Sequence, residues 1–322
     1  MTNAQDDHQL WIEKYRPQTF AEVKGHESIV ARLQAFVQQK NIPHILLSGP
    51  AGVGKTTLAL IIAKELYGDT WRQNMLELNA SDSRGIEVIR NEVKSFAMTM
   101  AMGTDLPKII YLDECDSLTK EAQQALRRTM ETFTRTARFI LSCNFSSKII
   151  DPIQSRCTIF RFKPLQQEDI RDIILTISKR EGLKIDDKTI EAISIVSRGD
   201  ARRAENILQS CSALNKTITE KLVYEIVSAA HPEEMKDVLQ MAVQGSFIQA
   251  RDKLLDVMLK HGLSGEEVVK QIQETVWKLS ISDQAKMQLI EKCGESEFRM
   301  VEGSDEFVQL EALLASFVLA KK

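Results

Sequence analysis

The residues best suited to chemistry form a phosphate-binding pattern in the first quarter of the chain. Residues 49–57 read GPAGVGKTT, between an apolar run at 44–48 and a helix-forming run at 58–67. This is G-x-x-x-x-G-K-[ST] in the strand–loop–helix setting where backbone N–H groups and a helix N-terminus surround phosphates. We therefore expect the loop to bind a nucleoside triphosphate, through Gly49, Pro50, Ala51, Gly52, Val53, Gly54, Lys55, Thr56 and Thr57.

Four side chains in and near this loop have the chemistry of ATP hydrolysis. Lys55 is expected to reach the β- and γ-phosphates, and the Thr56 hydroxyl to ligate Mg²⁺. Downstream, the apolar run 109–112 ends in two carboxylates, Asp113 and Glu114. Asp113 at a strand tip would hold Mg²⁺, and Glu114 would accept a proton from the attacking water. The carboxylate pair therefore predicts hydrolysis, not binding alone.

Three other polar residues lie next to predicted elements, and the sequence context suggests a different interpretation for each. Asn144 follows the apolar stretch 138–143, at the same expected sheet edge as Asp113, and is either a γ-phosphate contact or a turn asparagine. Arg156 lies between a predicted helical turn and the last apolar run, a context that by itself favours an ordinary surface arginine. Arg202 begins a predicted helix, where its charge opposes the helix dipole, a cost that an anionic partner would offset.

The order of apolar runs predicts the elements that position these residues. Short runs at 44–48, 75–78, 109–112, 139–141 and 159–162 alternate with helical stretches, including 85–97 and 120–132. This alternation predicts an α/β fold with a five-stranded parallel sheet covered on both faces. After Pro164 only amphipathic helices follow, one of them ended by Gly182 and another with Asp200 as its N-cap, and residues 230–232 interrupt them. We expect a nucleotide-binding domain at 1–163, a small helical domain at 164–230 and a helical domain at 231–322.

Composition limits the remaining possibilities. The 322-residue chain has a formal charge of −3, so a nucleic-acid surface would have to be local. Its five cysteines form no C-x-x-C pair, which argues against a zinc site or a disulfide framework. The start of the chain is polar and no apolar run approaches the length of a membrane span. We expect a cytoplasmic protein with no membrane partner.

Two local surfaces stand out. Residues 120–161 carry eight basic and three acidic side chains, an excess that fits contact with a phosphate backbone, although solvated helix faces are the alternative. The segment 96–102, FAMTMAM, is either a Met-rich partner surface or core. The expected DNA contacts, from this region and from a second basic line upstream of it, are Arg84, Arg90, Lys94 and Lys148.

In order and spacing, these motifs resemble those of the small subunit of archaeal-type replication factor C, the sliding-clamp loader of the AAA+ family. LDECD at 112–116, SCN at 142–144, SRC at 155–157 and GDARR at 199–203 carry the resemblance, together with the more specific WIEKYRP at 11–17 and NASDSRG at 79–85. It spans essentially the whole chain. The family usually has Pro-Gly-Thr at 51–53 and Ala in place of Cys115. Neither change affects a phosphate or metal ligand, so activity is expected.

The resemblance implies further roles. Arg156 would be an arginine finger for the γ-phosphate of a neighbouring subunit, Asn144 the sensor-1 residue and Arg202 the sensor-2 residue. Tyr15, Arg16 and Val23 would line the adenine side. The small helical domain would be a lid, the C-terminal domain a collar for oligomerisation, and the Met-rich segment a clamp-docking surface.

The implied function is ATP-dependent loading of the clamp PCNA onto primer–template DNA during DNA replication. ATP and Mg²⁺ binding would assemble the complex and hydrolysis would release it. The implied partners are a large subunit and other small subunits in a heteropentamer, with the clamp and DNA. Two alternatives are a mainly structural ring subunit with weak ATPase activity, and a related AAA+ branch-migration motor.

Overall fold

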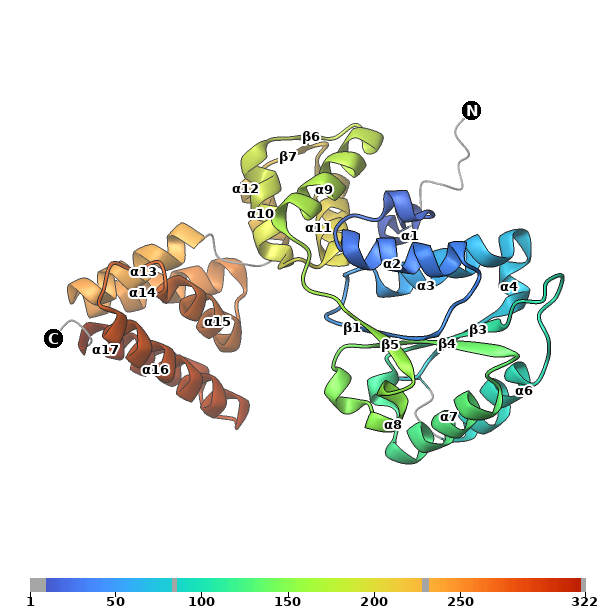
Figure 1. Ribbon diagram of the computed structural model, residues 1–322. Coiled ribbons are helices and arrows are strands. Elements are labelled where there is room, and N and C mark those ends of the chain that lie inside the picture. Colours follow the sequence, from blue (N-terminus) through green and yellow to red (C-terminus); the bar gives the residue numbers. More distant parts are fainter. Residues whose placement is uncertain (1–9, 83–85, 228–231, 320–322) are drawn as a thin grey trace. The chain divides into compact units, whose positions relative to one another are not determined.

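The computed structural model describes residues 10–82, 86–227 and 232–319. Two compact units make up the chain, residues 1–217 and 218–322. The first contains the sheet with the helices around it, and the second is built of helices (Figure 1). The predicted domain boundaries at 163/164 and 230/231 remain a prediction.

Five parallel strands form the sheet of the first unit, in the spatial order β2-β3-β4-β1-β5. Ile45 lies opposite Ile140 on one neighbouring strand and Thr158 on the other, which makes β1 a central strand. The predicted five-stranded parallel sheet is confirmed, and each apolar run lies within or overlaps one strand. The strands are β1 (His44–Ser48), β2 (Met75–Asn79), β3 (Lys108–Asp113), β4 (Ala137–Cys143) and β5 (Cys157–Arg161).

Both faces of the sheet are buried, as near-continuous apolar strands require. Ile45 and Leu47 belong to the core shared with α2 (Glu27–Gln38) and α3 (Lys55–Tyr67). Leu46, on the opposite face, belongs to the core shared with α7 (Lys120–Thr132) and α8 (Asp151–Gln154). Figure 1 shows these helices on the two sides of the sheet.

The predicted helix at 85–97 is not regular throughout. It comprises α5 (Ile86–Val88), a π-helical turn η3 (Ile89–Val93) and α6 (Lys94–Ala97). Single π-turns are rare in helices and often occur at functional sites. The Met-rich segment 96–102 begins at the end of α6. Its methionines Met98, Met100 and Met102 are exposed. The shorter elements are α1 (Trp11–Lys14), η1 (Phe20–Glu22), η2 (Gly68–Thr70), α4 (Trp71–Asn74), η4 (Cys115–Ser117) and η5 (Ser146–Lys148).

Three helices complete the first unit: α9 (Gln167–Glu181), α10 (Asp187–Ser197) and α11 (Ala201–Leu214). Helix α9 ends at Gly182 in the left-handed conformation, as predicted. Asp200 is the N-cap of α11, also as predicted, because its Oδ1 accepts a hydrogen bond from the backbone N of Arg203 at 3.1 Å. Strand β6 (Lys184–Ile185) pairs with β7 (Thr217–Ile218).

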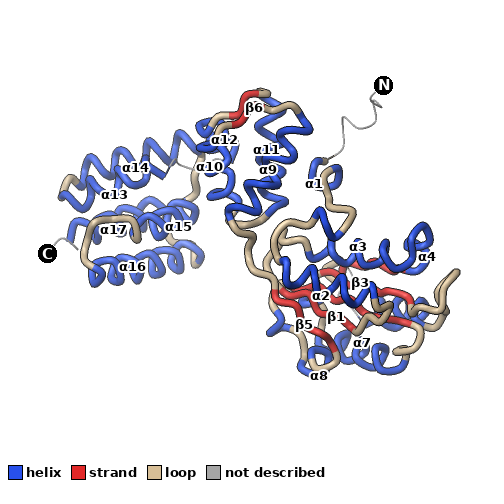
Figure 2. The backbone as a smooth tube through the Cα atoms, turned by 45° about the horizontal axis from the view of Figure 1, so that its top comes forward, coloured by secondary structure: helices blue, strands red, loops and turns tan. Residues whose placement is uncertain are grey.

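The second unit has a separate hydrophobic core that includes Leu239, Ile272 and Phe317. Figure 2 shows this part of the chain as helices joined by short loops. No helix in the described part of the chain is long and apolar enough to cross a membrane. The helices are α12 (Glu220–Val227), α13 (Pro232–Gln244), α14 (Phe247–His261), α15 (Gly265–Val276), α16 (Asp283–Val301) and α17 (Glu306–Leu319).

Candidate functional site

The phosphate loop joins β1 to α3 and is packed against the start of α11. Gly52 has a φ of +68°, and a Cβ on it would lie 1.7 Å from Oδ1 of Asp200. Its carbonyl oxygen accepts a hydrogen bond from the backbone N of Ala201 at 3.0 Å. Only glycine fits this close approach. The loop and the helical part of the first unit are therefore held together at Gly52.

Lys55 lies inside the loop and is only 8% exposed. Its Nζ donates hydrogen bonds to the carbonyl oxygens of Gly49 and Pro50 at 2.6 and 2.7 Å, and is 3.4 Å from Oδ1 of Asn144. Burial lowers the pKa of Lys55, while the nearby carboxylate of Asp113 acts in the opposite direction. A bound anion would stabilise this buried charge. The structure thus brings together Lys55 and Asn144, two residues predicted from separate motifs.

Thr56 and Asp113 meet where the loop faces the end of β3. The Thr56 hydroxyl donates to Oδ2 of Asp113 at 2.8 Å, and the Tyr111 hydroxyl donates to Oγ1 of Thr56 at 3.0 Å. Burial raises the pKa of Asp113, but hydrogen bonds from Tyr111, Thr56 and Ser142 outweigh it, so the net pKa is lowered. An adjacent hydroxyl and carboxylate are the hard oxygen donors that Mg²⁺ prefers, so these two residues fit the predicted metal.

Magnesium in such a site keeps several waters and binds substrate phosphates, so it needs few protein ligands. Within the described residues there is no cluster of three or more His, Cys, Asp or Glu side chains that could hold a metal. The pair Thr56 and Asp113 provides two adjacent oxygen ligands, a number that fits such an ion.

Glu114 adopts an uncommon backbone conformation for a residue other than glycine, with a φ of +50°. Its backbone N donates to Oδ1 of Asp113 at 2.9 Å, and its side chain is exposed beyond the end of β3. Left-handed residues of this kind cluster at functional sites, because the surrounding structure has to offset their strain. The catalytic role of Glu114 remains a prediction.

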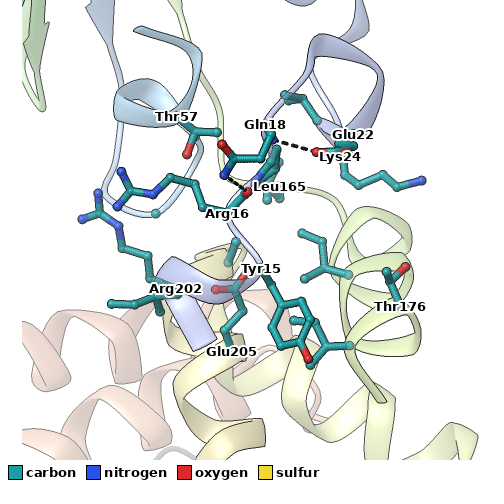
Figure 3. A pocket seen from close by; sticks show the side chains of 18 of the residues that line it. Tyr15, Arg16, Gln18, Glu22, Lys24, Thr57, Leu165, Thr176, Arg202 and Glu205 are labelled. Atoms are coloured by element: carbon teal, nitrogen blue, oxygen red, sulfur yellow. Dashed lines mark hydrogen bonds between the residues drawn. The ribbon is translucent and has the colours of Figure 1, made fainter. Parts of the chain in front are cut away.

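A cavity of about 430 Å³ adjoins the phosphate loop, within the size range of small-molecule sites. Tyr15, Arg16 and Arg202 line it (Figure 3), and so does Val23, while the expected contact of Tyr15, Arg16 and Val23 with adenine remains a prediction. Apolar side chains from α9, Ile173 and Ile177 among them, form part of its wall. Three separate stretches of the chain therefore build one pocket beside the phosphate loop.

The N-terminal segment is fastened to the helices behind this pocket. The backbone N of Trp11 donates to Oε1 of Gln209 at 3.0 Å, and Nζ of Lys14 donates to Oε1 of Glu181 at 2.7 Å. The Tyr15 hydroxyl also donates to Glu181. The segment is thus anchored to these helices through Trp11, Lys14 and Tyr15, and it also lines the cavity.

Arg156 is not among the residues that line this cavity. Its Nη2 lies 2.5 Å from Oε1 of Glu131 on α7, and its Nη1 donates to the carbonyl oxygen of Pro152 at 2.6 Å. The same Oε1 is 3.3 Å from Nη1 of Arg127. The Arg156 side chain is partly exposed. Its role toward a neighbouring subunit remains a prediction.

The expected DNA contacts are only partly described. Arg84 lies outside the described residues. Arg90 in the π-turn and Lys94 at the start of α6 are exposed. Lys148 is exposed too, with its Nζ 5.3 Å from the centre of the Phe145 ring. Their role in binding DNA remains a prediction.

Sequence reasoning missed several residues that shape the site. Asp116 accepts hydrogen bonds from the backbone N of Asn144 and of Phe145, at 3.4 and 3.3 Å, and so positions the turn that carries Asn144. Asp200 was predicted as a helix cap but not as a neighbour of the phosphate loop. Glu205 lines the cavity and belongs to no motif. Asp116 could have been suspected from its place in LDECD, but no sequence signal marks Glu205.

The sheet, the phosphate loop and the carboxylates at the end of β3 define an ATPase of the AAA class. The family model "ATPase family associated with various cellular activities (AAA)" matches residues 45–165. The model "Replication factor C C-terminal domain" matches residues 230–316.

The chain belongs to the replication factor C small subunit family. It is 52% identical over 305 residues to the replication factor C small subunit of Methanococcus maripaludis, covering 95% of this chain and 97% of that protein. It is 47% identical over 318 residues to the one of Archaeoglobus fulgidus, covering 98% and 100%. A solved structure of the Thermotoga maritima RuvB Holliday junction branch migration motor is similar in fold alone, with a TM-score of 0.56, 21% identity, and 74% and 85% of the two chains covered.

Proposed function

We propose that this chain is the ATP-hydrolysing small subunit of a clamp loader, which places the sliding clamp PCNA on primer–template DNA during replication. The observation that carries this proposal is the grouping of Lys55, Thr56, Asp113 and Asn144 around one loop in a chain of this family. ATP binding would assemble loader, clamp and DNA, and hydrolysis would release them.

Each of these residues has a task that suits its position. Loop N–H groups and Lys55 bind the β- and γ-phosphates, since burial has already removed the lysine from water. Thr56 and Asp113 would hold Mg²⁺, which supplies positive charge to the phosphate oxygens. Glu114 accepts the proton of the attacking water, and Asn144, oriented by Asp116, contacts the γ-phosphate or that water.

Completion of the site depends on residues from other elements and from other subunits. Arg202 contributes its charge from α11, beside the loop. Arg156 would leave Glu131 and reach the γ-phosphate held by a neighbour. The partners are a large subunit and further small subunits in a heteropentamer, with the predicted domain 231–322 as the collar. Because an archaeal-type clamp loader acts on replicating DNA, we expect the protein in the cytoplasm.

Glu114→Gln tests the catalytic assignment. The complex assembled with the large subunit, clamp and primed DNA should hydrolyse ATP about 10²–10⁴ times more slowly, since a general base contributes about that factor. ATP binding should persist, because the change leaves Lys55 and the loop intact. Glu191→Gln, an exposed carboxylate on α10, is the matched control and should keep full activity. An unchanged rate would favour the mainly structural ring subunit instead.

A second experiment distinguishes the clamp loader from a branch-migration motor. ATP turnover by the assembled complex should rise when clamp and primed DNA are both present. Steady unwinding of branched DNA without any clamp would contradict the loader assignment. The likeness to RuvB concerns the fold and gives that alternative no support beyond it.

A further inference from the structure

Glu205 is a carboxyl group in the wall of the nucleotide cavity for which the ATPase mechanism has no use. It lies on α11, three residues after Arg202, so both side chains are on the same face of the helix. Figure 3 shows its carboxyl group between the side chains of Arg202 and Tyr15. Both of these neighbours also line the cavity.

Within the described part of the chain, no protein group donates a hydrogen bond to the Glu205 carboxyl group or forms an ion pair with it, although the charges of Arg16 and Arg202 attract it. Burial makes the charged form of this carboxyl group costly, and without a protein donor it depends on water for its hydrogen bonds. A donor on a bound ligand would replace that water.

The chemistry of a nucleotide restricts where that donor can be. At neutral pH the triphosphate has only acceptors and negative charge, so it cannot satisfy a carboxylate. Helix α11 begins at the loop, where Ala201 donates to Gly52, and Glu205 lies four residues further on. That is about 6 Å along the helix axis, beyond the phosphates and toward the nucleoside. Carboxylates bind ribose hydroxyls in a similar way in dinucleotide sites.

We infer that Glu205 recognises the nucleoside half of the bound nucleotide by accepting a hydrogen bond from a ribose hydroxyl or from the amino group of the base. This inference rests on the proposed ATP site and adds a residue that determines which nucleotide fits it. Glu205 would therefore favour ATP over analogues that lack the donor.

The charge of Glu205 depends on its surroundings. Burial and the carboxylate of Asp200 raise its pKa to about 7, while Arg16 and Arg202 lower it. Glu13 acts in the same direction as Asp200. The recognition should thus be strong at pH 8, where the carboxylate is charged, and weak at pH 6. Other titratable groups that line the cavity are Lys14, Tyr15, Glu22, Lys24 and Arg180.

The test measures equilibrium binding of ATP, 2′-deoxy-ATP, 3′-deoxy-ATP and ITP to the full chain at pH 8. A hydrogen bond to a charged group corresponds to about a tenfold preference or more. The wild-type chain should therefore bind ATP about tenfold more tightly than at least one of these analogues. A preference over a deoxy nucleotide assigns the ribose hydroxyl, and a preference over ITP assigns the amino group.

Glu205→Leu removes the acceptor and should abolish the preference, while Glu205→Gln keeps a neutral acceptor and should retain a smaller, pH-independent one. Thermal unfolding of both variants checks that they fold, and Glu191→Gln is the control for loss of a charge. Wild-type preferences in Glu205→Leu would overturn the inference. Lys55→Ala tests the site separately: if it binds ATP normally, the proposed nucleotide site is wrong, whatever Glu205 does.

Discussion

Replacing Gly52 by alanine should separate the phosphate loop from helix α11. Its φ of +68° costs an L-residue about 1–2 kcal/mol. The new Cβ would also lie 1.7 Å from Oδ1 of Asp200, the atom that caps α11. Moving Asp200 would lose the cap, about 1 kcal/mol, and the bond from Ala201 to Gly52, about another 1 kcal/mol. We expect a total destabilisation of about 3–4 kcal/mol.

Gly54→Ala is the matched comparison, because Gly54 also has a positive φ, +93°, but no atom within 4 Å of the position of its Cβ. It should cost only the conformational term, about 1–2 kcal/mol. The assay is urea unfolding of the full chain followed by tryptophan fluorescence, with Trp11 as a buried probe of the first unit. Nucleotide binding measured in parallel should weaken in both variants.

A double-mutant cycle with Asp200→Ala isolates the clash. Alone, this change should cost about 1 kcal/mol through the lost cap. Combined with Gly52→Ala, it should cost less than the sum of the two single changes, because the obstructing oxygen has gone. Equal losses for Gly52→Ala and Gly54→Ala, together with strict additivity in the cycle, would refute the close approach as the reason for glycine here.

Three further predictions concern carboxylates of the first unit. The pKa of Glu205 is raised to about 7, so its charge destabilises the fold above that pH and not below about 4.5. Thermal unfolding should therefore show that Glu205→Gln raises stability at pH 8 by up to about 3 kcal/mol and leaves it unchanged at pH 4.5. Glu131→Gln breaks a partly exposed pair with Arg156, so urea unfolding should show a loss below about 1 kcal/mol, while ATP turnover of the assembled complex changes if the arginine acts in a neighbour. Burial raises the pKa of Glu181, but hydrogen bonds from Lys14 and Tyr15 outweigh it, so the net pKa is lowered. The stabilisation from these contacts should be present at pH 7 and lost as pH falls through the lowered pKa, and thermal unfolding of Glu181→Gln should lack this pH dependence.

Local sequence patterns predicted the fold because the strands and helix ends are determined mainly by residues close together in the sequence. The inner strands β1, β3 and β4 are buried on both faces, so an apolar run was enough to find them, and the half-buried edge strands β2 and β5 kept enough apolar residues to be found as well. The ends of α9 and α11 followed from Gly182 and Asp200, whose backbone and side-chain preferences act on adjacent residues. The π-turn at 89–93 could not be found this way, because the helical apolar spacing around it is unchanged.

Much of the site followed from one geometric rule, that parallel strands end at a common edge, which brings Asp113 and Asn144 to the loop. This rule does not predict contacts between segments that are far apart in the sequence. Nothing in GPAGVGKTT indicates that Gly52 meets Asp200, because the reason is an approach between parts of the chain far apart in sequence. Glu205 resembles any polar residue beside the apolar stripe of α11 until the N-terminal segment covers it.

The cavity takes its walls from residues 12–24, 52–57 and 165–205, and this has a consequence for synthesis of the chain. A ribosome produces the phosphate loop roughly 150 residues before Glu205, a delay of roughly 8–30 s at typical elongation rates. During that interval the loop lacks the helix start that Gly52 binds. The nascent N-terminal half therefore cannot form a complete nucleotide pocket. Its stability has to come from the sheet until α11 has been synthesised.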